Sequence, residues 1–148
     1  MRRDVITAYV EKLLGAQTGS DRVVPDGDGD YPVRLGGALS YVRLTGETDP
    51  DVQVFSVALQ EVPPSAELLA ELNDINGRIR FARIFHVQQE VLVETNLVGE
   101  SVDPLGFRTA CEAVAQVAGK VGPTLAKKYG GRVIDAAGDY APQTGMYL

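Results

Sequence analysis

The fold is decided by one stretch, Ser65–Val98, which reads SAELLAELNDINGRIRFARIFHVQQEVLVETNLV. Ser65 follows two prolines and is a favourable helix N-cap, and leucine and isoleucine recur after it at helical spacing. Gly77 can take the left-handed conformation that ends many helices. Beyond it, apolar residues recur at every second position, and a second β-branched run follows Gln88 and Gln89. The stretch therefore predicts a helix, a stop and a two-stranded hairpin.

The residues before this stretch predict one helix and three strands. Arg3–Leu14 carries an amphipathic stripe, and Gly15 follows it as a stop signal. Extended segments follow at Tyr31–Leu35, Ala38–Thr45 and Val52–Gln60. Pro32 cannot donate a ladder hydrogen bond, which places the first of these strands at a sheet edge or at a strand start. We expect Gly36 and Gly37 to form a turn.

The residues after it predict one long helix. Asp103 is an N-cap and Pro104 suits the first helical position, where a missing N–H is harmless. Gly122-Pro123 should kink or break this helix, because an internal proline removes a hydrogen bond and clashes with the preceding turn. We expect residues 1–131 to form a single domain and residues 132–148 to form a loosely attached tail.

The order of elements is helix, three strands, helix, two strands, helix. Strands joined by short turns predict an α+β fold, in which three helices accompany an antiparallel five-stranded sheet. Several strands are apolar on both sides, so helices would cover one face and a partner or the tail would cover the other.

We assign the two sides of the hairpin from strict alternation. The more mixed side is predicted to bind a partner, and it carries Arg80, Ile84, His86, Leu92 and Glu94. The more apolar side is predicted to face the helices, and it carries Ile79, Phe81, Phe85, Val91 and Val93. Arg83 falls on that apolar side, which predicts a bulge or a buried ion pair. Aspartate at both Ile84 and Leu92 should then weaken binding without unfolding the chain.

Composition narrows the function. The chain has 148 residues, 45% hydrophobic and 23% charged, as in ordinary globular proteins. Its net charge of −6 argues against nucleic-acid binding and against adsorption to anionic membranes. Cys111 is the single cysteine, which excludes an internal disulfide and suits a reducing cytoplasm.

Two residue groups raise chemical hypotheses that a simpler interpretation outweighs. Asp26, Asp28 and Asp30 match the first half of a calcium loop, but the glycine and the bidentate glutamate of that loop are missing. We favour a solvated acidic turn and expect neither a metal site nor a cofactor. His86 and Cys111 would need to be neighbours to catalyse a reaction, and Cys111 lies on an apolar helical stripe. We therefore predict no catalytic residue.

Two polar groups flank the end of the middle helix. Arg78, Arg80 and Arg83 form a basic cluster on an acidic chain. The cluster could bind an acidic segment of a partner, or it could pair across the hairpin with Glu90 and Glu94. Asn73 and Asn76 are predicted to bond exposed backbone groups near the helix end, and we favour this structural role for them.

The run LLAELNDINGRIRFAR at 68–83 resembles the central segment of the YbjN-like proteins, which are related to type III secretion chaperones of the Tir-chaperone kind and are common in actinobacteria. Three shorter motifs are also similar to that group. They are Asp28–Val33, Asp103-Pro104 and Tyr129–Gly131. The likeness spans Asp4 to Gly131. It implies a secretion-chaperone-like fold, a homodimer and a client that is a peptide segment of another protein.

We therefore predict a non-enzymatic, cytoplasmic, chaperone-like protein that binds partner polypeptide through its sheet. One alternative is a regulatory module that binds a single folded partner in a sensory or stress pathway. Another is a small enzyme or ligand-binding protein that uses the loop Asp26–Asp30.

Overall fold

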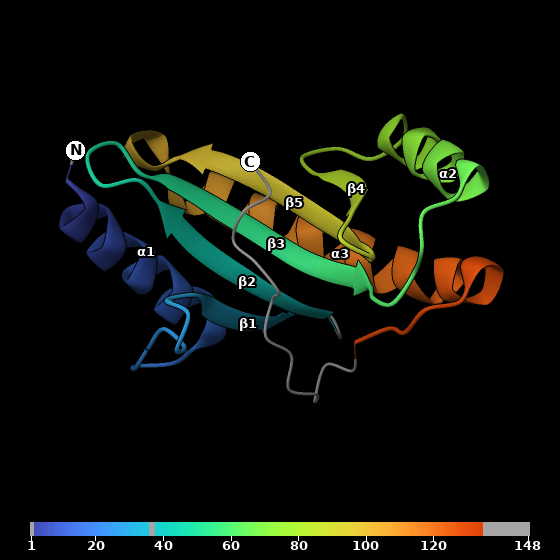
Figure 1. Ribbon diagram of the computed structural model, residues 1–148. Coiled ribbons are helices and arrows are strands. Elements are labelled where there is room, and N and C mark those ends of the chain that lie inside the picture. Colours follow the sequence, from blue (N-terminus) through green and yellow to red (C-terminus); the bar gives the residue numbers. More distant parts are fainter. Residues whose placement is uncertain (1, 36–37, 135–148) are drawn as a thin grey trace.

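The computed structural model describes residues 2–35 and 38–134, and its elements follow the predicted order (Figure 1). They are α1 (Arg3–Thr18), β1 (Tyr31–Leu35), β2 (Ala38–Thr45), β3 (Asp51–Leu59), α2 (Ala66–Asn76), β4 (Arg83–Val87), β5 (Glu90–Val98), the 3-10 helix η1 (Gly99–Ser101) and α3 (Pro104–Tyr129). The strands form an antiparallel sheet in the order β1-β2-β3-β5-β4. The predicted α+β class is confirmed, with Pro32 on an edge strand. The predicted turn at Gly36 and Gly37 lies outside the described residues.

The two predicted N-caps are confirmed. The Ser65 hydroxyl accepts a hydrogen bond from the Leu68 N–H at 3.1 Å and starts α2. The Asp103 carboxylate accepts one from the Gly106 N–H at 2.6 Å and starts α3, with Pro104 in the first turn. Each side chain satisfies one of the backbone donors that a helix start leaves without an intrahelical partner.

One predicted helix end is wrong, and a second is right in position but not in conformation, because Gly77 does cap the end of α2. Helix α1 continues through Gly15 and ends at Gly19, whose φ of +71° is the left-handed conformation. Gly77 keeps a right-handed φ of −72°, and its N–H reaches the carbonyl oxygens of Asn73 and Asp74 at 3.2 Å each. Helix α2 therefore ends by tightening its last turn, which needs no left-handed residue.

Of the kink or break predicted at Gly122-Pro123, the break is wrong, because α3 is continuous from Pro104 to Tyr129. Gly122 lies against β3, and a Cβ on it would come within 2.4 Å of the Ala58 carbonyl oxygen. Pro123 removes a single N–H on the exposed side of the helix, while Leu125 in the next turn is fully buried. Packing against the sheet thus holds the helix together across the proline.

The three helices lie on one side of the sheet, which we call the inner face. Figure 1 shows α3 crossing behind the strands, with α1 near β1 and α2 near β4. One large apolar cluster joins the helices to this face. Its helical members include Val10, Leu68, Phe107 and Leu125, and its sheet members include Val54. Burial of these aliphatic and aromatic side chains is the main source of stability.

The last described residues are held against the end of β3. The backbone of Arg132 exchanges two hydrogen bonds with the backbone of Gln60, at 2.8 and 2.9 Å. The predicted division into a domain and a tail from residue 132 stays a prediction, because residues 135–148 lie outside the described residues.

Candidate functional site

In the hairpin of β4 and β5, several side chains point to the opposite face of the sheet from the one that strict alternation predicts. Strand β4 begins at Arg83, because Phe81 adopts a left-handed φ of +63° and interrupts the extended chain. Gln88 and Gln89 also have positive φ values, of 50° and 66°, as in the tight two-residue turns of hairpins. This turn pairs Phe85 with Leu92. Residues directly opposite each other share a face of the sheet.

The prediction that five hairpin residues share one face is therefore wrong. Ile84 pairs with Val93 on the inner face, where both are buried. Leu92 lies on the opposite side in the cluster that includes Phe85, although alternation from Ile79 predicted Phe85 to face the helices. Asp at Ile84 would consequently disrupt the core.

The other predicted site residues are placed separately. Glu94 lies on the same side as Leu92, two residues along β5. Arg80 is exposed in the loop before β4. The His86 ring Nε2 lies 2.8 Å from the Val62 carbonyl oxygen. The structure thus brings Leu92 and Glu94 together and leaves Arg80, Ile84 and His86 elsewhere.

A second apolar cluster lies on the side of the sheet away from the helices, which we call the outer face. We call this group the outer cluster, and its buried members are Leu39, Tyr41, Phe55, Val57 and Leu92. The rings of Tyr41 and Phe55 stack with their centroids 5.4 Å apart. Partly buried Phe85, Val87 and Ile134 pack against it. The prediction that both faces of the sheet are apolar is confirmed.

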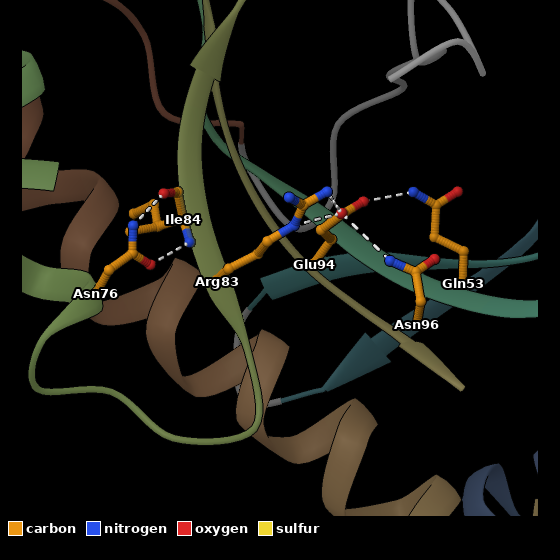
Figure 2. A network of polar contacts seen from close by, with 6 residues as sticks. All are labelled: Gln53, Asn76, Arg83, Ile84, Glu94 and Asn96. Carbon is orange, nitrogen blue, oxygen red and sulfur yellow. Dashed lines mark hydrogen bonds and ion pairs between the residues drawn. The ribbon is translucent and has the colours of Figure 1, made fainter. Parts of the chain in front are cut away.

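A polar network centred on Glu94 of β5 (Figure 2) lies beside the outer cluster, since Glu94 pairs with Phe55 across the strands. Glu94 is only 2% exposed, and its carboxylate accepts hydrogen bonds from Gln53 at 2.5 Å, from Asn96 at 3.3 Å and from the Arg83 Nε at 2.7 Å. An Arg83 terminal nitrogen completes an ion pair with the same carboxylate. The predicted cross-strand pairing of Arg83 with Glu94 is confirmed. Three donor side chains hold this buried charge in place.

A second arginine borders the cluster on β2. Arg43 forms a bidentate pair with Asp30, with N–O distances of 2.6 and 2.7 Å, and its guanidinium lies 4.8 Å from the Phe55 ring centroid. Arg83 lies at the same distance over the Phe85 ring. The outer face therefore has an aromatic and aliphatic centre between two arginines whose charges are balanced by Asp30 and Glu94. Arginine and aromatic side chains are typical of protein-binding surfaces.

The free edge of β4 is partly covered by α2. The Asn76 amide donates to the Ile84 carbonyl oxygen and accepts from the Ile84 N–H, both at 2.8 Å (Figure 2). The side chain thus imitates one residue of a neighbouring strand and limits edge-to-edge pairing there. The predicted bonding of Asn76 to backbone groups is right in kind but wrong in place, because those groups belong to β4 and not to the end of α2.

The acidic loop has a structural role. The Asp26 carboxylate accepts the N–H groups of Asp28 and Asp30, both at 2.9 Å, and closes a turn. Asp30 is buried and is paired with Arg43. Within residues 2–35 and 38–134, no group of three or more His, Cys, Asp or Glu side chains has an arrangement that could hold a metal ion.

Cys111 lies in the large apolar cluster between the helices and the inner face, which we call the inner cluster. Burial there raises the pKa of its thiol to about 12. A thiol with this pKa is protonated at neutral pH and is a poor nucleophile. The His86 ring contacts the Val62 carbonyl oxygen, in the loop between β3 and α2. The predicted small-hydrophobe role of Cys111 is confirmed.

Comparison with known proteins agrees with this geometry. The family model TY-Chap1, described as T3SS (YopN, CesT) and YbjN peptide-binding chaperone 1, matches residues 4–137. No curated protein matches the chain.

Among the described residues, no helix has both the length and the apolar character that spanning a membrane requires.

Solved structures with a similar fold include three with low sequence identity. The crystal structure of the ExsC–ExsE complex is 15% identical with a TM-score of 0.61, and the match covers 80% of this chain and 95% of that chain. The Yersinia pestis type III secretion chaperone SycH, solved with a stable fragment of YscM2, is 11% identical over 76% and 96% of the two chains, with a TM-score of 0.57. YbjN from E. coli is 17% identical over 83% and 93%, with a TM-score of 0.53.

The fold is thus that of the secretion chaperones, and the class is that of non-enzymatic, peptide-binding chaperone-like proteins. The chain belongs to the TY-Chap1 family. The predicted resemblance to the YbjN-like and type III secretion chaperone proteins is confirmed.

Proposed function

We propose that this protein binds an extended segment of a client polypeptide on the outer face of its sheet. One observation supports this proposal above all. The outer cluster lies away from the three helices, yet Ile134, from beyond the end of α3, packs against it. A side chain from outside the sheet already docks there, and client side chains would take its place.

The chemistry of the outer face suits an extended, partly apolar segment. Alternate side chains of an extended chain point the same way, about 7 Å apart, and meet the rows of a sheet. Once Ile134 is displaced, the cluster of Tyr41, Phe55 and Leu92 would offer those side chains an apolar surface. The guanidinium of Arg83, whose side chain is 60% exposed, can donate to client carbonyl oxygens. Leu92 and Glu94 are then the predicted site residues that stay in the proposed site.

Binding must displace Ile134, because Phe55 and Leu92 have no exposed surface of their own. The earlier alternative, in which the tail covers this face, is supported by Ile134 for its described part. Client and Ile134 would then compete for the same cluster. The predicted homodimer and the cytoplasmic location stay predictions.

The test uses three variants and a panel of short synthetic peptides with alternating apolar residues. We expect Ile134→Ser to raise affinity severalfold, because it weakens the competitor, and Phe85→Ser to lower it by about tenfold. Leu105→Ser is the control, since Leu105 is 63% exposed at the start of α3. Fluorescence anisotropy of the labelled peptides measures all three. Equal affinities for the wild type and for every variant would contradict the outer-face site.

A further inference from the structure

The loop between α2 and β4 carries an exposed aromatic ring in an unusual backbone conformation. Phe81 has a φ of +63° and is 60% exposed. Bulky residues rarely adopt this conformation, and exposing a large ring contributes little to the core. The Arg80 guanidinium lies over the ring, 5.2 Å from its centroid. The loop therefore presents an aromatic and a cation together to solvent.

An apolar groove continues from this loop between α2 and α3. The groove holds about 310 Å³ and is floored by the four aliphatic residues Ile75, Ile79, Val117 and Val121. Arg78 and Lys120 stand at its rim, one from each side. The volume suits one or two large side chains, and the rim suits carboxylates beside them.

The cations at this place lack the carboxylate partners that Arg43 and Arg83 have on the outer face. Arg83, the third member of the basic cluster, pairs with Glu94, whereas Arg78, Arg80 and Lys120 form no ion pair with any residue in the described ranges. The Arg78 Nε donates only to the backbone oxygen of Asp74, at 3.4 Å.

The acidic residues of α2 compensate this charge only in part, although the Arg78 guanidinium does interact with the Glu71 carboxylate and helps to lower its pKa. Glu71 is occupied by the Tyr129 hydroxyl at 2.7 Å and by the Lys128 ammonium at 3.1 Å. Asp74, one turn before Arg78, is the carboxylate nearest in sequence to these three cations. The net result is a local excess of positive charge on a chain of net charge −6.

We propose that this region is a second docking site, for an acidic segment of a partner protein that carries one or two apolar anchor residues. The anchors would fill the groove and contact Phe81, and carboxylates would pair with Arg78, Arg80 and Lys120. We call these residues and the groove the basic patch. A symmetric dimer through the patch is disfavoured, because a twofold axis would bring the same three cations face to face.

The proposal is independent of the outer face. The floor of the groove packs against the inner cluster, on the helix side of the sheet. A client on the outer face and an acidic partner on the basic patch could therefore be bound together. Loss of one site would leave the other intact.

The test uses short labelled peptides that combine glutamates with two leucines at alternate, i,i+3 or i,i+4 spacing. We expect the wild type to bind at least one spacing, with an affinity that falls as ionic strength rises. Replacing all three cations by glutamine (R78Q, R80Q and K120Q) should weaken binding about tenfold or more. The matched control removes three exposed cations elsewhere (K12Q, R34Q and R108Q) and should leave binding unchanged.

The Phe81→Gly variant distinguishes a loss of peptide binding from a loss of stability. Glycine accepts the positive φ without strain, so this variant should keep the thermal midpoint of the wild type or raise it, and still bind the acidic peptide several times more weakly. The proposal is overturned if no acidic peptide binds, if glutamine-for-glutamate peptides bind equally well, or if the patch and control variants behave alike. Dissociation of a wild-type dimer by the patch variant, seen in sedimentation, would assign the patch to a second copy instead and also overturn it.

Discussion

The two faces of the sheet are both apolar, but the chain covers them in different ways. The inner face meets three helices and buries aliphatic side chains together with Phe107 and Tyr31. The outer face gathers stacked aromatic rings between two arginines, and the one hydrophobic residue that the described part of the chain adds to it from outside the sheet is Ile134. The inner face is thus part of the core, whereas the outer face has the composition of an interface.

This difference shows what two-sided apolarity can and cannot indicate. A wholly polar outer side of an antiparallel sheet would have predicted contact with water, whereas an apolar centre on that side predicts contact with protein. The chemistry of the arginines then distinguishes an interface from a core, because Arg43 and Arg83 keep their partners Asp30 and Glu94 beside the apolar surface. The following predictions test this contrast between the faces, in order of expected effect.

The largest effect is expected from aspartate at two neighbouring residues of β4. Ile84→Asp would bury an unpaired charge in the inner cluster and should lower the free energy of unfolding by more than about 4 kcal/mol. Phe85→Asp, on the outer face beside Arg83, should lower it by only about 1–2 kcal/mol. Urea unfolding followed by circular dichroism measures both. Similar losses for the two variants would show that the faces are equally part of the core.

A smaller effect is expected where α3 approaches the inner face most closely. Gly122→Ala would push a methyl group toward the Ala58 carbonyl oxygen and should lower the free energy of unfolding by about 1–3 kcal/mol. Gly27→Ala is the control, because a Cβ there would meet nothing within 4 Å. If Gly122→Ala is as stable as the control, the helix can move away from the sheet and the inner face is less tightly packed than we infer.

The start of the covering helix gives the next effect. Asp103→Ala removes the N-cap bond to the Gly106 N–H and should lower the free energy of unfolding by about 1 kcal/mol. Peptide binding on the outer face should not change, since α3 lies on the other side of the sheet. Thermal unfolding and anisotropy on the same samples test the two statements together, and a loss of affinity with intact stability would argue against separate faces.

The smallest effect is expected from ionisation of the Cys111 thiol on the inner side, which lowers stability only at alkaline pH. Burial raises the pKa of its thiol to about 12 from an ordinary 9.0, so its contribution to stability is complete below pH 9 and is lost as the pH rises toward 12. Wild type should lose about 1 kcal/mol by pH 10 that Cys111→Ala does not lose. Urea unfolding at pH 7 and pH 10 measures the difference. Equal pH dependence of the two proteins, or rapid labelling of the native thiol, would contradict its burial.

The sequence predicts much of the fold because local signals agree with it. Ser65 and Asp103 are N-caps by their chemistry alone. The extended segments that form β2 and β3 and the order of elements follow from apolar runs bounded by turn residues. Helix continuity was harder to predict, because the contacts of Leu125 and Gly122 with distant elements outweigh the local effect of Pro123.

The sequence predicted an apolar partner-binding face on the sheet, but it did not predict most of the residues that lie on that face. Two-sided apolarity correctly indicates a second cluster, yet the face of each β4 side chain depends on where the strand begins. Phe81 in the left-handed region shifts that start to Arg83, and a conformation unusual for phenylalanine has no sequence signal. The Arg83–Glu94 pair was the available clue, since opposite charges on adjacent strands favour a shared face.

The outer-face site is tested most directly by nuclear magnetic resonance of isoleucine, leucine and valine methyl groups during titration with the tightest peptide of the alternating panel. We predict that the largest shifts occur at Leu39, Val57, Leu92 and Ile134, with Val114 on the helix side little changed. Shifts concentrated at Ile75 and Val117 with an unaltered outer cluster would place the client between α2 and α3 and contradict the proposed site.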